Sequence, residues 1–171
     1  MQTPLLLSEA PEHFIELSQK AQRLLPPEER AIRCVNSLNI GYGYMALVDL
    51  PTARAAFEQA LQEGLAGGNL YAAIYGPISL ILIASVEGRN GEALQVCETH
   101  IQRFKKLLAG QRFHPIGALY VLQGTLLLEQ DRLEEAEQAV AQGLELVRWT
   151  GEYAAHMIRL YNPGAYLRHP G

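Results

Sequence analysis

Hydrophobic residues recur along the chain at three- and four-residue intervals, which is the spacing of one face of an α-helix. In residues 9–25, such a stripe consists of Leu17, Ala21, Leu24 and Leu25. No stretch of useful length alternates between hydrophobic and polar residues as a half-buried strand would. The pattern therefore predicts an all-α fold of about seven or eight helices.

Prolines and glycines set the expected ends of these helices. Pro26-Pro27 ends the first helix, Pro51 suits the first position of a helix, and Gly67-Gly68 stops that helix. Pro77 is expected to kink a helix over residues 70–87. The expected helices cover residues 9–25, 28–47, 51–65, 70–87, 91–108, 116–130 and 133–149, with a partial helix and tail over 152–171.

One helix-turn-helix pattern occurs three times, over residues 29–67, 70–108 and 114–150. Gly41 and Ala53 are twelve residues apart in the first repeat, and Gly124 and Ala136 keep that separation in the third. Small residues at this spacing let two paired helices cross closely. The second repeat is degenerate: its Ala93 aligns with Ala53, but Ile81 and Cys97 stand in the glycine and phenylalanine positions.

The first repeat resembles the tetratricopeptide (TPR) motif, because it places Gly41, Tyr44, Ala53, Phe57 and Ala60 in the order and spacing of that motif. The steps of 40 and 43 residues between Ala53, Ala93 and Ala136 exceed the roughly 34 residues of ordinary TPRs. With these longer repeat steps, the chain resembles the sensor superhelix of MalT-type, LuxR-class transcriptional activators. The resemblance implies one domain over residues 1–171, built as a right-handed superhelix of antiparallel helix pairs.

In that family an ATPase module precedes the superhelix and a DNA-binding helix-turn-helix follows it. This sequence has neither a GxxxxGK[ST] phosphate loop nor a recognisable DNA-reading helix. The resemblance therefore implies a sensor arm, either standing alone or as part of a larger regulator.

A second stripe, on the first helix of each repeat, is the candidate binding surface. In TPR-like superhelices this stripe lines the concave face. Its residues are Val35, Leu38, Tyr42 and Met45 in the first repeat, Tyr75, Ile78 and Leu82 in the second, and Val121 and Thr125 in the third. They form either an apolar groove for a peptide helix or small molecule, or the packing surface against a neighbouring repeat. The stripe carries no Lys or Arg, which argues against capture of peptide carboxylates.

Composition narrows the function further. The net charge of −4 argues against a nucleic-acid-binding segment. Charged residues make up 19%, below the usual value of about 25%, so we expect surfaces that are covered by a ligand, a partner or a second copy.

Cys34 and Cys97 form no CxxC motif and indicate buried thiols in a reducing, cytoplasmic compartment. Residues 65–86 carry no charge, but glycines and Pro77 interrupt them, which argues against a membrane span.

No pattern of catalytic or metal-binding residues appears in the sequence. The five histidines lack metal-ligand spacing, and no nucleophile with its base can be nominated. Residues 41–46 imitate a dinucleotide fingerprint, but a helix precedes them where that motif needs a strand. A basic cluster of Arg103, Lys105, Lys106, Arg112 and His114 is either a phosphate contact or a solvated helix end.

We therefore expect a module without enzymatic activity, cofactor, metal or membrane contact. Its expected function is ligand sensing or protein–protein interaction in a signal-transduction or transcription regulator, with a peptide, protein or small-molecule inducer in the groove. The alternative is a homo-oligomerisation module that uses the same apolar groove.

Overall fold

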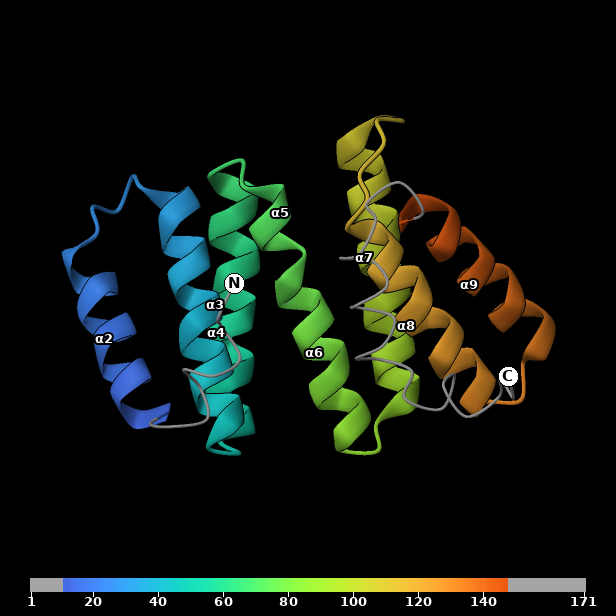
Figure 1. Cartoon of the computed structure of the whole chain (residues 1–171), viewed down its shortest axis with the longest axis horizontal. Helices are drawn as coiled ribbons and strands as arrows, with labels where there is room; N and C mark the ends of the chain where they lie inside the picture. The colour runs from blue at the N-terminus through green and yellow to red at the C-terminus, as the bar shows by residue number, and fades with distance from the viewer. Residues whose placement is uncertain (1–10, 148–171) are drawn as a thin grey trace, which may run out of the picture. The chain divides into compact units, whose positions relative to one another are not determined.

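The computed structural model describes residues 11–147 of the chain, and every regular element in that range is an α-helix (Figure 1). The helices are α2 (Pro11–Leu24), α3 (Arg30–Ala46), α4 (Leu50–Ala66), α5 (Leu70–Ala73), α6 (Tyr75–Val86), α7 (Asn90–Leu108), α8 (Ile116–Glu129) and α9 (Leu133–Val147). The expected all-α, TPR-like solenoid is confirmed. The partial helix expected from Glu152 lies outside the described residues.

The chain divides into two compact units at Gly88 and Arg89. The first contains α2 to α6 and the second contains α7 to α9. The division falls within the repeat expected over residues 70–108, so each unit is described by itself.

The single kinked helix expected over residues 70–87 is wrong, because α5 ends at Ala73 and α6 begins at Tyr75. Pro77 explains the break: it lacks the N–H that would bond to the carbonyl of Ala73, four residues earlier. In the first turn of α6 that missing donor costs nothing. The interruption therefore lies at Ile74, ahead of the proline and not at it.

Four of the turns between helices share one backbone conformation. Val48, Gly68, Gly88 and Asp131 all have a positive φ, between 59° and 74°, and each stands two positions before the start of the next helix. Glycine, and to a lesser extent Asn and Asp, adopts this left-handed conformation readily, whereas β-branched residues do not. Val48, at φ 61°, is therefore the strained member of the set.

In the first unit, α3 and α4 cross so closely that only a glycine fits on α3. A Cβ atom placed on Gly41 would lie 2.5 Å from Cε1 of Phe57. The Phe57 ring is fully buried beside Ala53 and Ala60, and the ring of Tyr42 meets it edge-on at a centroid distance of 5.1 Å. The small and large residues of the repeat thus interlock as expected.

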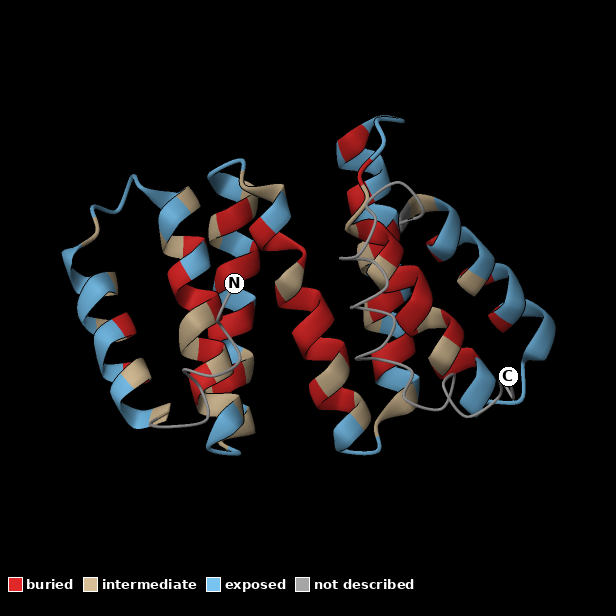
Figure 2. Cartoon of the chain, in the orientation of Figure 1, coloured by how far each residue is buried: buried red, intermediate tan, exposed pale blue. Residues whose placement is uncertain are grey.

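The second unit repeats this arrangement with a smaller side chain, Val140, in the place of Phe57. A Cβ atom on Gly124 of α8 would lie 2.4 Å from Cγ2 of Val140 and 3.0 Å from the carbonyl oxygen of Ala136, both on α9. Gly124 and Val140 are sixteen residues apart, as are Gly41 and Phe57. The register predicted between the first and third repeats is confirmed by these contacts. Buried residues run along α3, α4 and α6 in the first unit and along α7 and α8 in the second (Figure 2).

Helix α2 is held to the first unit mainly by polar contacts. Its only buried residues are Ile15, whose Cγ1 fits against Gly43, and Ser18. Arg33 of α3 donates to the carbonyl oxygens of Gln22 and Leu25 at 3.0 and 3.1 Å, which satisfies groups that the end of a helix leaves free.

Two side chains complete this attachment. Asn36 donates to the Ser18 carbonyl oxygen at 2.6 Å and to the Gln22 side chain at 2.9 Å. Glu63 of α4 accepts from Arg33 at 3.1 Å and from the Ser37 hydroxyl at 2.9 Å. One cluster of mutually satisfied polar groups therefore joins α2, α3 and α4.

The close crossing predicts opposite outcomes for two Gly→Ala changes. Gly41→Ala should lower the free energy of unfolding by about 1–3 kcal/mol, because the added methyl group overlaps a ring that cannot move. Gly91→Ala is the matched control, since Gly91 is also helical and nothing lies within 4 Å of its added Cβ. It should leave stability unchanged or raise it by up to about 1 kcal/mol. Urea unfolding followed by circular dichroism measures both, and equal effects would contradict the interlocked register.

The strained turn predicts a stabilising substitution. Val48→Asn should raise the free energy of unfolding by about 0.5–1 kcal/mol, because asparagine tolerates a positive φ and Val48 is exposed. Val86→Asn, at an exposed position with ordinary helical geometry, is the control and should give no gain. Thermal melts of the two variants would disprove the strain if Val48→Asn were no more stable than the parent.

Candidate functional site

In the first unit, the candidate stripe lies on α3 and α6. The structure brings Leu38, Tyr42, Met45 and Tyr75 to one hydrophobic cluster around Phe57. Leu38 is buried in that cluster, and the other three are half-buried against it. Ser79 of α6 donates a long hydrogen bond of 3.5 Å to the Tyr42 hydroxyl, which therefore connects α3 with α6.

The stripe residues differ in what they offer to a ligand. Leu38 and Ile78 are buried and belong to the core, as the packing alternative expects. Val35 is 43% exposed, and Tyr42, Met45, Tyr75 and Leu82 are half-buried. The accessible part of the stripe in this unit is therefore these five side chains, and none of them is charged. They are called the first-unit stripe below.

The two stripe residues of the second unit offer less. Val121 of α8 is buried. Thr125 is half-buried, and its hydroxyl donates to the Val121 carbonyl oxygen at 3.1 Å, a bond within its own helix. Neither residue presents a free apolar side chain to a ligand.

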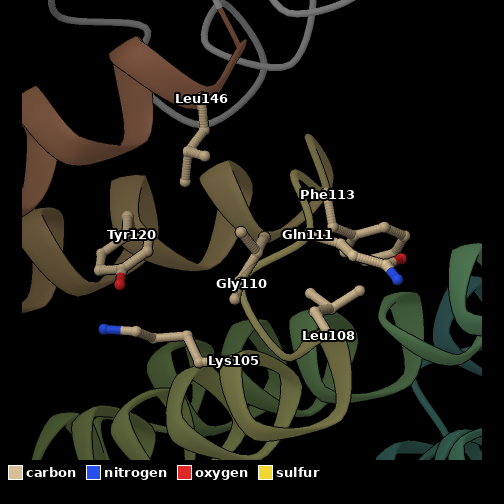
Figure 3. A pocket seen from close by; sticks show the side chains of 8 residues that line it. Lys105, Leu108, Gly110, Gln111, Phe113, Tyr120 and Leu146 are labelled. Carbon is tan, nitrogen blue, oxygen red and sulfur yellow. The ribbon is translucent and has the colours of Figure 1, made fainter.

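The second unit instead contains a pocket that the sequence did not indicate. Its volume is about 250 Å³, and it lies among α7, the connector to α8, α8 itself and the end of α9 (Figure 3). Its lining residues are Lys105, Leu108, Gly110, Gln111, Phe113, Ile116, Tyr120 and Leu146.

Local geometry explains why the pocket forms. Ala109 and Gly110 have φ values of 46° and 86°, so the chain turns sharply away from α7. Phe113 is then buried, and its ring stacks on that of Phe104 at a centroid distance of 6.2 Å with the planes 8° apart. His114 lies with Nδ1 2.7 Å from the Leu146 carbonyl oxygen, which fixes the end of α9 beside the start of α8.

The pocket walls are apolar and its polar groups are few. Figure 3 shows the Lys105 amine and the Tyr120 hydroxyl at one side of the hollow, with the Phe113 ring at the other and Leu146 above. Among residues 11–147, neither the Lys105 amine nor the Tyr120 hydroxyl has a hydrogen-bond or ion-pair partner. The sequence singled out Lys105 in a basic cluster, but the apolar walls come from four separate segments that no local pattern connects.

Burial shifts the pKa of three titratable side chains in the described helices. Burial, and secondarily the charge of Glu63, raises the pKa of the Cys34 thiol to about 11. Burial, with the charge of Glu98, raises the pKa of Cys97 to about 12. Burial and the nearby Arg103 charge lower the pKa of His100. In the part of the chain that the structure describes, no three His, Cys, Asp or Glu residues are grouped to hold a metal.

None of the described helices is both long enough and apolar enough to cross a membrane.

No curated protein and no solved structure matches the chain. A family model described as the MalT-like TPR region matches residues 6–163, which is most of the sequence. This match, together with the interlocked helix pairs, shows that the chain belongs to the MalT-like TPR region family.

Proposed function

We propose that this chain is the sensing or protein-interaction module of a LuxR-class transcription regulator, and that it works in the cytoplasm by binding and not by catalysis. It receives a small-molecule inducer, a peptide or a protein partner on the first-unit stripe. Membership of the MalT-like TPR region family supports a regulatory role, and the buried, unreactive thiols of Cys34 and Cys97 fit a reducing compartment.

The observation that carries the proposal is the chemistry of the first-unit stripe. Val35, Tyr42, Met45, Tyr75 and Leu82 are accessible or half-accessible and uncharged. The repeat does not need an exposed Val35, because Gly41, Ala53 and Phe57 already make the close crossing. Tyr42, Met45 and Tyr75 pack against one hydrophobic cluster, and accessible apolar and aromatic side chains of this kind favour recognition of a partner.

The homo-oligomerisation alternative uses the same side chains. A second copy that covered Val35 and Tyr75 would also remove apolar surface from water. The two functions differ in one measurable respect: only oligomerisation makes the molecular mass depend on the concentration of the protein itself.

A charge placed on the stripe should weaken binding of the ligand. We would titrate the full chain, followed by amide NMR, with one amphipathic helical peptide and a panel of sugars, amino acids and nucleosides. A true ligand should shift the amide signals of α3 and α6. Val35→Lys should lower the affinity for that ligand by roughly tenfold or more, because the added charge must be desolvated when the ligand covers it. Leu17→Lys on α2 is the control, since Leu17 is 52% exposed but lies off the stripe, and it should leave the affinity unchanged.

Shifts confined to α2 and to exposed residues of α4 would contradict the stripe as the binding surface. Light scattering across protein concentration completes the experiment. A mass that rises with concentration in the parent but not in Val35→Lys would favour the oligomerisation alternative.

A further inference from the structure

The geometry points to a second binding site in the second unit, in which the pocket between α7, α8 and α9 holds a small aromatic carboxylate. This inference does not depend on the first-unit stripe, because all the lining residues belong to α7, α8, α9 and the connector between α7 and α8.

The volume of the pocket limits the size of its ligand. A closed protein cavity of about 150 Å³ admits one benzene molecule. The pocket here is open to solvent on one side, and by the same ratio its volume of about 250 Å³ encloses about ten non-hydrogen atoms of a ligand. One six-membered ring that carries a short acidic side chain has this size, whereas an oligosaccharide or a peptide helix would leave most of its atoms outside the pocket.

The walls select an apolar, flat ligand body. Leu108, Ile116 and Leu146 supply aliphatic surface, and Phe113 and Tyr120 supply ring surface on different sides of the hollow (Figure 3). Phe113 is fixed by its stacking on Phe104, so this wall is in place before a ligand arrives. An aromatic ring fills such a space while losing little conformational freedom.

The polar groups select a negative charge at one end of that body. Lys105 supplies an ammonium group, and Tyr120 supplies a hydroxyl that can donate a hydrogen bond. No Asp or Glu is among the lining residues, so no carboxylate of the pocket itself competes for these donors. A ligand carboxylate at the side where the two donors lie would accept from both, while its ring occupies the apolar remainder.

The test uses phenylacetate, which has one ring and one carboxylate within the size limit. In amide NMR titrations of the full chain, phenylacetate should produce saturable shifts at Gly110 and Gln111, with a dissociation constant on the order of 1 mM. Phenylacetamide, which has the same shape without the charge, should bind about threefold to tenfold more weakly, because Lys105 is exposed and its ion pair is screened.

Two single-residue variants test the donors individually. Lys105→Met should weaken phenylacetate binding by about threefold to tenfold and leave phenylacetamide unchanged. Lys106→Met is the matched control, because Lys106 is an exposed neighbour outside the lining and should retain the parent affinity. Tyr120→Phe removes only the hydroxyl and should lower the affinity for phenylacetate by about threefold to tenfold.

Three outcomes would overturn the inference. The first is the absence of saturable shifts at a phenylacetate concentration about ten times the expected dissociation constant. The second is equal affinity for phenylacetate and phenylacetamide. The third is an equal loss of phenylacetate affinity in Lys105→Met and Lys106→Met. Val35→Lys separates this inference from the proposed function. It should leave phenylacetate binding intact even if the first-unit stripe binds nothing.

Discussion

The whole fold depends on how closely two helices of one repeat can approach. Gly41 and Gly124 leave no room for even one methyl group, and the side chain that fills each gap stands sixteen residues later, as Phe57 or Val140. Because a gap this tight admits one arrangement, it fixes the register of α3 against α4 and of α8 against α9. These two crossings also set the positions of the stripe residues on α3 and of the pocket residues on α8 and α9.

The attachment of α2 follows a different physical rule. Instead of burying a wide apolar face, α2 contributes Ile15 and is otherwise joined by hydrogen bonds to Arg33, Asn36 and, through Gln22, Glu63. Each polar group in the cluster has a partner, so burial does not leave a charge or an amide unpaired. Such a contact is directional, and it sets the position of α2 more strictly than apolar contact alone would.

The sequence predicted the parts of the fold that come from short-range periodicity. The helices, the Gly41–Ala53 and Gly124–Ala136 pairs and the interlocking of Phe57 all follow from spacing within some twenty residues. The break at Ile74 was misplaced because Pro77 acts on the carbonyl four residues before it. The polar cluster was missed because Gln22, Arg33 and Glu63 look like ordinary surface residues until three helices bring them together.

The candidate site was harder to predict because burial depends on neighbours. Helical spacing placed Leu38, Ile78 and Val121 on the same stripe as Val35, but only the assembled units show that the first three are buried. The pocket depends on Lys105, Phe113, Tyr120 and Leu146, which stand on three different helices and a connector and therefore share no single helical face. Only the turn at Ala109 and Gly110 brings them together.

These differences indicate where specificity can arise in such a repeat protein. Residues that define the repeat, such as Gly41 and Phe57, are buried in the helix crossing, so they cannot contact a ligand or distinguish one ligand from another. Selectivity must come from positions that the motif leaves free, such as Val35, or from departures from the motif. The connector between Leu108 and Ile116 is the larger departure, because it buries Phe113 and leaves Lys105 without a partner among the described residues. An irregular connector within a regular scaffold can therefore vary in ligand chemistry without disturbing either helix crossing.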